Sequence, residues 1–226
     1  ALVSVRHPED FSEIAKQQLL KSSLPFFRSV SIHHVDAIAS TAERRSNLPF
    51  PLNFEIGPQL QPALKGLGFI EEQTVYHYTI EMSESESKVS DEALWRESQD
   101  YIAIRDLFWK QSNATGLDSS LVTLGLEMAM ARGKLLTYSN DGRISMALGI
   151  EPLADSVVVW PLMADLSAVD LSGAAEAVYD VIRPLGKVRL QIPIVALGQQ
   201  DLISALCNLC SSGVSFRENI LMRKNL

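Results

Sequence analysis

The sequence predicts an α/β protein in which a mixed central sheet is flanked by helices. Three observations support this prediction. Apolar residues recur with helical spacing in some segments and with alternating or continuous strand spacing in others. Asp141-Gly142 separates two strand-like segments, and this dipeptide is typical of a tight hairpin turn. A strand, a helix and a strand follow within 156–194, which implies a mixed sheet with helices on its faces.

The first 82 residues are predicted to contain both helices and strands. Pro8 and the acidic residues after it favour a helix start, and Pro25 is predicted to end that helix. Alternating apolar and β-branched residues then predict a strand. Pro58 suits the start of a short helix, and Gly68 suits its C-terminal cap. The expected elements are, in order, helix 8–22, strand 26–33, helix 35–45, helix 58–67, and a strand or a bent pair over 69–82.

Residues 83–90, with the sequence SESESKVS, form a low-complexity stretch. Alternating serine and glutamate has no apolar face for a core to bury, so the stretch is predicted to be a linker or an exposed loop. It divides the chain into two predicted units, 1–82 and 91–226. A chain of 226 residues is long enough for one large domain or two small ones.

The second unit is predicted to begin with two helices and to continue with strands and further helices. Asp118 or Ser119 suits an N-cap, and Gly133 suits the C-cap of the same helix. The expected elements are helices 91–112 and 118–132, a hairpin of 134–139 and 143–150, a buried strand 156–162, helix 171–185 capped at Ser172 and Gly186, strand 187–194, helix 199–210, and one bent strand or two short ones over 214–225.

Charge and hydropathy exclude two classes of partner. The net charge is −7 and the pI is about 5.1. An acidic chain repels phosphate backbones unless it holds a basic patch, and the basic pairs near residues 44 and 223 are too short for one, so we expect no nucleic acid partner. No apolar run reaches about 18 residues, so we expect no membrane partner. The first residues do not resemble a signal peptide, and the use of cysteine suits a reducing compartment, so the expected location is the cytoplasm.

The order of elements in 91–226 resembles that of the acyl-CoA N-acetyltransferase (GNAT) superfamily. SVVVWPLMADL resembles its central strand, LSGAAEAVYDVIRPLG its CoA-facing helix, and DLISALCNLCSSGVSF its last helix and turn. In the first unit, PALKGLGFIEEQTVYHYTIEM resembles the family's helix, Leu-Gly-Phe turn and closing strands, which makes 1–82 a partial repeat. The resemblance implies a GNAT-like fold, acetyl-CoA as co-substrate, and transfer of an acetyl group to an amine of a small molecule or protein.

The resemblance also implies where the cofactor would bind, between the strand 156–162 and the helix 171–185. Trp160 and Leu162 would lie where the central strand separates from its neighbour and admits the pantetheine arm. Ser172, Gly173 and Ala174 would present backbone N–H groups to the pyrophosphate at a helix N-terminus, where the helix dipole favours an anion.

The sequence departs from the family pattern at two kinds of position. Asp165 and Asp170 lie near the expected phosphate site and would repel a pyrophosphate. The family's general-acid tyrosine is replaced by Leu209, counted from Gly213, and by Leu64 in the partial repeat. A leucine donates no proton, so we assign no catalytic residue.

Other residues have a functional and a structural interpretation. Glu127 and Asp155 are the carboxylates nearest the expected cleft, and each is a candidate general base or a solvated surface residue. His33-His34-x-Asp36 offers metal ligands, but neighbouring strand residues point to opposite faces, so we expect no metal.

Three functions remain open from the sequence. The first is an acyltransferase that relies on positioning and backbone hydrogen bonds. The second is a catalytically silent relative that binds a ligand or a partner protein. The third is an unrelated α/β scaffold subunit.

Overall fold

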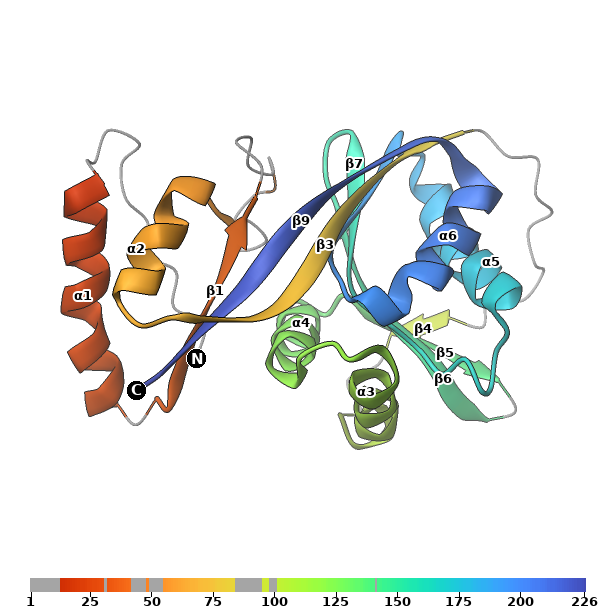
Figure 1. Cartoon of the computed structure of the whole chain (residues 1–226). Coiled ribbons are helices and arrows are strands. Elements are labelled where there is room, and N and C mark those ends of the chain that lie inside the picture. Colours follow the sequence, from red (N-terminus) through yellow and green to blue (C-terminus); the bar gives the residue numbers. More distant parts are fainter. Residues whose placement is uncertain are drawn as a thin grey trace. The chain divides into compact units, whose positions relative to one another are not determined.

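The computed structural model describes residues 13–30, 32–41, 48, 55–83, 95–97, 101–140 and 142–226, and Figure 1 shows their helices and strands. They belong to two compact units, one containing the described residues up to Val75 together with Arg217–Leu226, the other lying within Tyr76–Phe216. Two long strands, β3 (Ile70–Met82) and β9 (Ser211–Asn225), contribute residues to both units. The sequence-based division at 83–90 stays a prediction, and residues 84–94 lie outside the described residues.

The described residues of unit 1 form two α-helices and a small set of strands. Its elements are α1 (Glu13–Ser29), β1 (His34–Ser40), β2 (Glu55–Ile56), the 3-10 helix η1 (Pro58–Leu60), α2 (Gln61–Gly66) and parts of β3 and β9. β1 runs parallel to β2 and antiparallel to β9, with a register from His34↔Asn225 to Ser40↔Asn219. A small buried cluster of α2, β1 and β9 residues with Phe69 forms its core: Ala39, Leu64, Phe69 and Met222.

Two predictions for this unit are confirmed. The expected helix 58–67 is present as η1 and α2, and Gly68 follows it with a positive φ of 83°. This left-handed conformation favours glycine, as expected of a C-terminal cap. The expected strand 69–82 is present as β3.

Three predictions for the N-terminal segments are wrong. Pro25 lies inside α1 and does not end it, and the expected strand 26–33 is occupied by the end of α1 and the turn after it. Phe27 is buried, and this packing offsets the loss of one backbone donor at Pro25. Residues 35–40 of the expected helix 35–45 belong to the strand β1, because seven consecutive pairs with β9 outweigh the local helix preference, and residues 42–45 lie outside the described residues. Residues 8–12 lie outside the described residues.

Unit 2 has a mixed sheet with the strand order β9-β3-β8-β7-β6-β5-β4. This confirms the predicted fold class. Its elements are β4 (Trp95–Glu97), α3 (Tyr101–Thr115), α4 (Ser119–Ala131), β5 (Leu135–Asn140), β6 (Arg143–Pro152), β7 (Ser156–Ala164), α5 (Leu171–Ile182), η2 (Arg183–Leu185), β8 (Arg189–Val195), η3 (Leu197–Gln199) and α6 (Gln200–Cys210).

The predicted elements of unit 2 agree with these bounds apart from the start of the first helix and one cap. The helix expected over 91–112 is α3, which begins at Tyr101, and residues 91–94 and 98–100 lie outside the described residues. Trp95 was expected in a helix but lies in β4, where it pairs with Tyr138 and its indole Nε1 donates to Ala177 O at 2.9 Å. The N-cap of α5 is Asp170 and not Ser172.

Helices cover both faces of this sheet (Figure 1). Val157, Val159 and Leu162 pack in one buried cluster with residues of α5 and α6. Trp160 packs against α4, where a Cβ added to Gly125 would lie 2.9 Å from its ring. The central strand is therefore buried on both sides, as its continuous apolar sequence predicts.

Candidate functional site

The two central parallel strands, β7 and β8, are paired over part of their length. Their pairs run from Ser156↔Arg189 to Val158↔Gln191, and both strands continue beyond these pairs. The strand edge left by this separation is the position that the sequence resemblance assigns to a pantetheine arm. We call the edge of β7 from Leu162 to Ala164, on the side turned away from β6, the β7–β8 slot.

A bulge in β7 begins the slot. Leu148 of β6 pairs with Leu162 of β7, whereas Ile150 pairs with Val159. Between these two pairs, β7 therefore contains one residue more than β6. The extra residue lies at Trp160-Pro161, whose peptide bond is cis. Bulges of this kind re-aim the following backbone groups. Beyond it, Asp165 N donates to Ser145 O of β6 at 2.8 Å, so the neighbouring Ala164 N–H points away from β6 and into the slot.

Two buried glutamines fill the slot. Gln199 Nε2 donates to Leu162 O at 3.0 Å, and Gln199 Oε1 accepts from Ala196 N at 2.9 Å. Gln111 Nε2 donates to Leu162 O at 3.5 Å, and Gln111 Oε1 accepts from Ala164 N at 3.3 Å. Their exposed fractions are 3% for Gln111 and 5% for Gln199. The backbone groups of β7 that face the slot are therefore bound by the chain's own amides.

The α5 N-terminus, where the resemblance places a pyrophosphate, is capped by its own aspartate. Asp170 Oδ1 accepts from Gly173 N at 2.7 Å, and Asp170 O accepts from Ala174 N at 2.8 Å. The Ser172 hydroxyl donates to Glu176 Oε1 at 3.3 Å. A carboxylate thus occupies the place at which a phosphate would meet the Gly173 amide. As they stand, these residues do not fit a phosphate group.

The side chains of Trp160 and Leu162 lie in the core. Both are buried, Trp160 against α4 and Leu162 in the cluster with α5 and α6. Of these two residues, the atom that reaches the slot is the Leu162 carbonyl oxygen. Of the five residues assigned to the cofactor, Leu162 thus lies at the slot, and Ser172, Gly173 and Ala174 lie at the α5 N-terminus.

Asp165, which follows β7, is held by an ion pair. Its carboxylate accepts from Lys110 Nζ at 2.5 Å and from Ser167 Oγ at 2.5 Å. Burial alone would raise the pKa of Asp165, but these hydrogen bonds outweigh it and hold the pKa below its usual value. The pair lines a hollow of about 220 Å³ with Asp106 and Arg143. Two cations there are balanced by two carboxylates, so the hollow is not an anion site.

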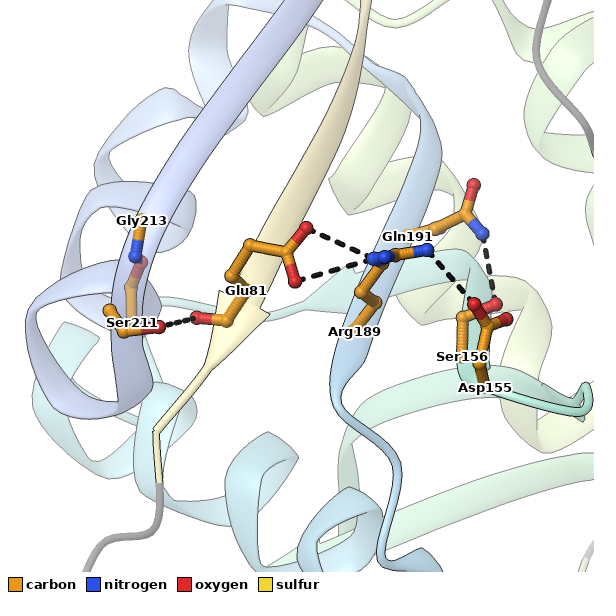
Figure 2. A network of polar contacts seen from close by, with 8 residues as sticks. Glu81, Asp155, Ser156, Arg189, Gln191, Ser211 and Gly213 are labelled. Atoms are coloured by element: carbon orange, nitrogen blue, oxygen red, sulfur yellow. Dashed lines mark hydrogen bonds and ion pairs between the residues drawn. The ribbon is translucent and has the colours of Figure 1, made fainter.

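The two carboxylates considered as general bases lie on the surface. Glu127 is exposed on α4. Asp155 accepts from Arg189 Nη1 at 2.9 Å, and Arg189 Nε donates to Glu81 at 3.0 Å. Figure 2 shows Arg189 between these two acids, with Gln191 donating to Ser156 beside them. This network ties β3, β8 and the start of β7 together and supports a structural interpretation of Asp155.

The described histidines and cysteines do not form a reactive cluster. Asp36 accepts two hydrogen bonds from Arg223 at 2.7 and 2.8 Å within unit 1. Burial raises the pKa of the Cys207 thiol, and it raises the pKa of the Cys210 thiol to about 11. Both shifts disfavour the thiolate. Among the residues that the structure describes, no three His, Cys, Asp or Glu side chains are grouped to hold a metal ion.

Sequence reasoning missed Gln111 and Gln199. A signal for Gln111 exists, because Ile104, Leu107, Phe108 and Gln111 share helical spacing and the first three are apolar. A glutamine that continues a buried apolar stripe needs partners for its amide. Gln199 lies in a short 3-10 segment without such a pattern.

No family model and no curated protein matches the chain. Among the described residues, no helix has the length and apolar character needed to cross a membrane. Solved structures do match. A provisionally assigned acetyltransferase of Pyrococcus horikoshii is 17% identical, with a TM-score of 0.56 over 96% of this chain and 62% of that chain.

Two further structures have the same kind of fold. A glucosamine N-acetyltransferase region of a fungal multi-domain β-N-acetylglucosaminidase is 12% identical, with a TM-score of 0.54 over 92% of this chain and 27% of that one. A GCN5-related N-acetyltransferase of Sphaerobacter thermophilus is 10% identical, with a TM-score of 0.53 over 97% of this chain and 70% of that chain. This chain therefore spans less than two thirds of the first two structures. At these identities the likeness concerns the fold, and this chain has the fold of the GNAT N-acetyltransferases.

Proposed function

We propose that this chain is a binding module built on the N-acetyltransferase fold, and that it does not use acetyl-CoA as an acyl donor. Its ligand would be a small molecule or a partner protein in the cytoplasm. The observation that supports this function best is the cap of α5, where Asp170 Oδ1 accepts from Gly173 N at 2.7 Å. Leu209, at the position that the resemblance gives to a general acid, supports it as well.

The cap lowers the affinity of this helix start for phosphate in two ways. A phosphate that bound Gly173 N would displace the Asp170 carboxylate, and an N-cap stabilises a helix by about 1 kcal/mol. The displaced carboxylate would remain within ~4–6 Å of the phosphate, which costs on the order of 1–2 kcal/mol near a protein surface. Together these effects amount to roughly 2–3 kcal/mol, or about a hundredfold in affinity.

Acetyl transfer to an amine is the second candidate function. The partial separation of β7 from β8 and the bulge at Trp160-Pro161 favour it, because they expose a strand edge beside the central strand. The two candidates differ in whether the wild-type protein binds acetyl-CoA.

Calorimetric titration of the wild-type protein with acetyl-CoA separates the two functions. We expect no binding at millimolar acetyl-CoA and no acetylation of an amine panel. Micromolar binding together with acetyl transfer would exclude the binding-module function.

The contribution of the cap is tested with ADP, which carries phosphates and no pantetheine arm. Asp170→Asn keeps the shape of the cap and removes its charge, so we expect ADP to bind about tenfold more tightly. Asp201→Asn, an equal change of charge in the first turn of α6, is the control and is expected to have no effect. Equal ADP affinities for the two variants would contradict the role of Asp170.

A further inference from the structure

The β7–β8 slot is closed by parts of two segments that are far apart in the sequence. Gln111 lies in α3, and Gln199 ends η3, the short helix before α6. Both side chains bind Leu162 O, and each binds a further backbone amide, Ala164 N for Gln111 and Ala196 N for Gln199. Each glutamine therefore uses its donor and its acceptor, as a buried amide must.

The backbones of the same two segments are also in direct contact. A Cβ added to Gly198 would lie 2.7 Å from Thr115 Cα and 2.7 Å from Thr115 O. A side chain does not fit between them, so glycine is what permits this approach. Thr115 is one helical turn after Gln111, and its hydroxyl donates to Gln111 O at 2.8 Å. We call Gln111, Thr115, Gly198 and Gln199 the α3–η3 clasp.

We propose that the α3–η3 clasp keeps the β7–β8 slot closed to an extended ligand such as a pantetheine arm. A ligand that lay along β7 would have to take Leu162 O and Ala164 N from the glutamines. It would also leave two glutamine amides unpaired in a buried environment. The closure is therefore a property of these four residues and is independent of the α5 cap. This proposal rests on the proposed function only in that the proposed closure and the proposed function concern the same cofactor.

The experiment opens the clasp and uses D-pantetheine as the probe, since it carries the arm without phosphates. The variants are Gln199→Ala and the double variant Gln111→Ala with Gln199→Ala. Gln191→Ala is the matched control, because Gln191 also bonds to β7, through Ser156 Oγ at 3.0 Å, but at the paired end of the strands. Binding is followed by calorimetry, and circular dichroism establishes that each variant is folded.

We expect no pantetheine binding by the wild-type and Gln191→Ala proteins at millimolar concentration. The double variant is expected to bind at least about tenfold more tightly than the wild type, with Gln199→Ala between them. Wild-type binding as tight as that of the double variant would overturn the proposal. A folded double variant that binds no better than wild type would also overturn it.

Hydrogen exchange of the wild-type protein tests the closure without a variant. The amides of Ala164 and Ala196 should exchange as slowly as that of Val158, which lies in the paired part of β7. Exchange of both amides more than about a hundredfold faster than that of Val158 would show an open slot and overturn the proposal. Failure here leaves the ADP result on Asp170 unchanged, so the two proposals fail separately.

Discussion

Substituting Gly149 with alanine tests the packing of β6 against the bulge in β7. Gly149 lies between the two β6 residues at which the register shifts. An added Cβ would lie 2.4 Å from Trp160 O and 2.8 Å from Ala129 Cβ, well inside van der Waals contact. Because Trp160 O is a backbone atom, the two strands must separate, and the overpacking penalty should be near the upper end of its usual range, about 3 kcal/mol.

The net loss of stability is smaller, because alanine is favoured over glycine in a strand by roughly 0.5–1 kcal/mol. We therefore expect Gly149→Ala to destabilise the fold by about 2 kcal/mol. For a chain of this size, that lowers the melting temperature by roughly 4–8 °C. Differential scanning calorimetry measures it, with Gly213→Ala as the control, since a Cβ at Gly213 meets nothing within 4 Å. Equal melting temperatures for the two variants would refute the described bulge.

Two further predictions concern charged groups. Asp165→Asn should lower stability at pH 7 by about 1–2 kcal/mol, because it removes charge-assisted hydrogen bonds from Lys110 and Ser167. The pKa of Asp165 is lower in the folded protein, so its stabilisation is complete above the unfolded pKa and is lost as the pH falls through the folded pKa. Urea unfolding should therefore give a constant difference from pH 7 to about 5 that shrinks below roughly 4, whereas a constant difference at all pH values would contradict this assignment. Arg189→Gln removes contacts with Glu81 and Asp155, but all three side chains are well exposed, so we expect less than about 1 kcal/mol. That small difference in urea unfolding should vanish at high salt, and a larger, salt-independent loss would show that the network is more than a surface contact.

The elements of unit 2 were predictable because their signals are local. Asp118 caps α4 through its own side chain, which accepts from Ser120 N. Gly133 and Gly186 have positive φ at the ends of helical segments, and Gly142 has it in the hairpin turn. Each of these signals involves residues within a few positions of one another, so the sequence alone contains the information.

The failures in unit 1 have non-local causes. The segment of β1 has no strong strand pattern, and it is a strand because residues near the end of the chain pair with it. Pro25 lies within a helix whose continuation depends on the burial of Phe27. Neither fact can be read from a window of neighbouring residues.

The strand and the helix around which the site is proposed were predictable, but their side-chain contacts were not. The strand, the helix start and the small residues at Gly173 and Ala174 follow from pattern. The sequence predicted Ser172 as the cap of this helix, whereas Asp170 caps it in the structure, and local pattern does not separate them because both residue types are good caps. The meeting of Gln111 with Gln199 depends on how α3 and η3 pack, which no spacing rule predicts.

The pairing of β1 with β9 sets the order in which the chain can fold during synthesis. Thr41, at the end of β1, bonds to Glu218, which is 177 residues later in the sequence. The ribosome therefore releases β1 long before its antiparallel partner exists, whereas the strands β5, β6 and β7 can pair as they emerge. In that interval β1 has an open edge, a known starting point for aggregation. The strand β1 of unit 1 is thus made before the strands of unit 2, and its pairing with β9 can form only after them.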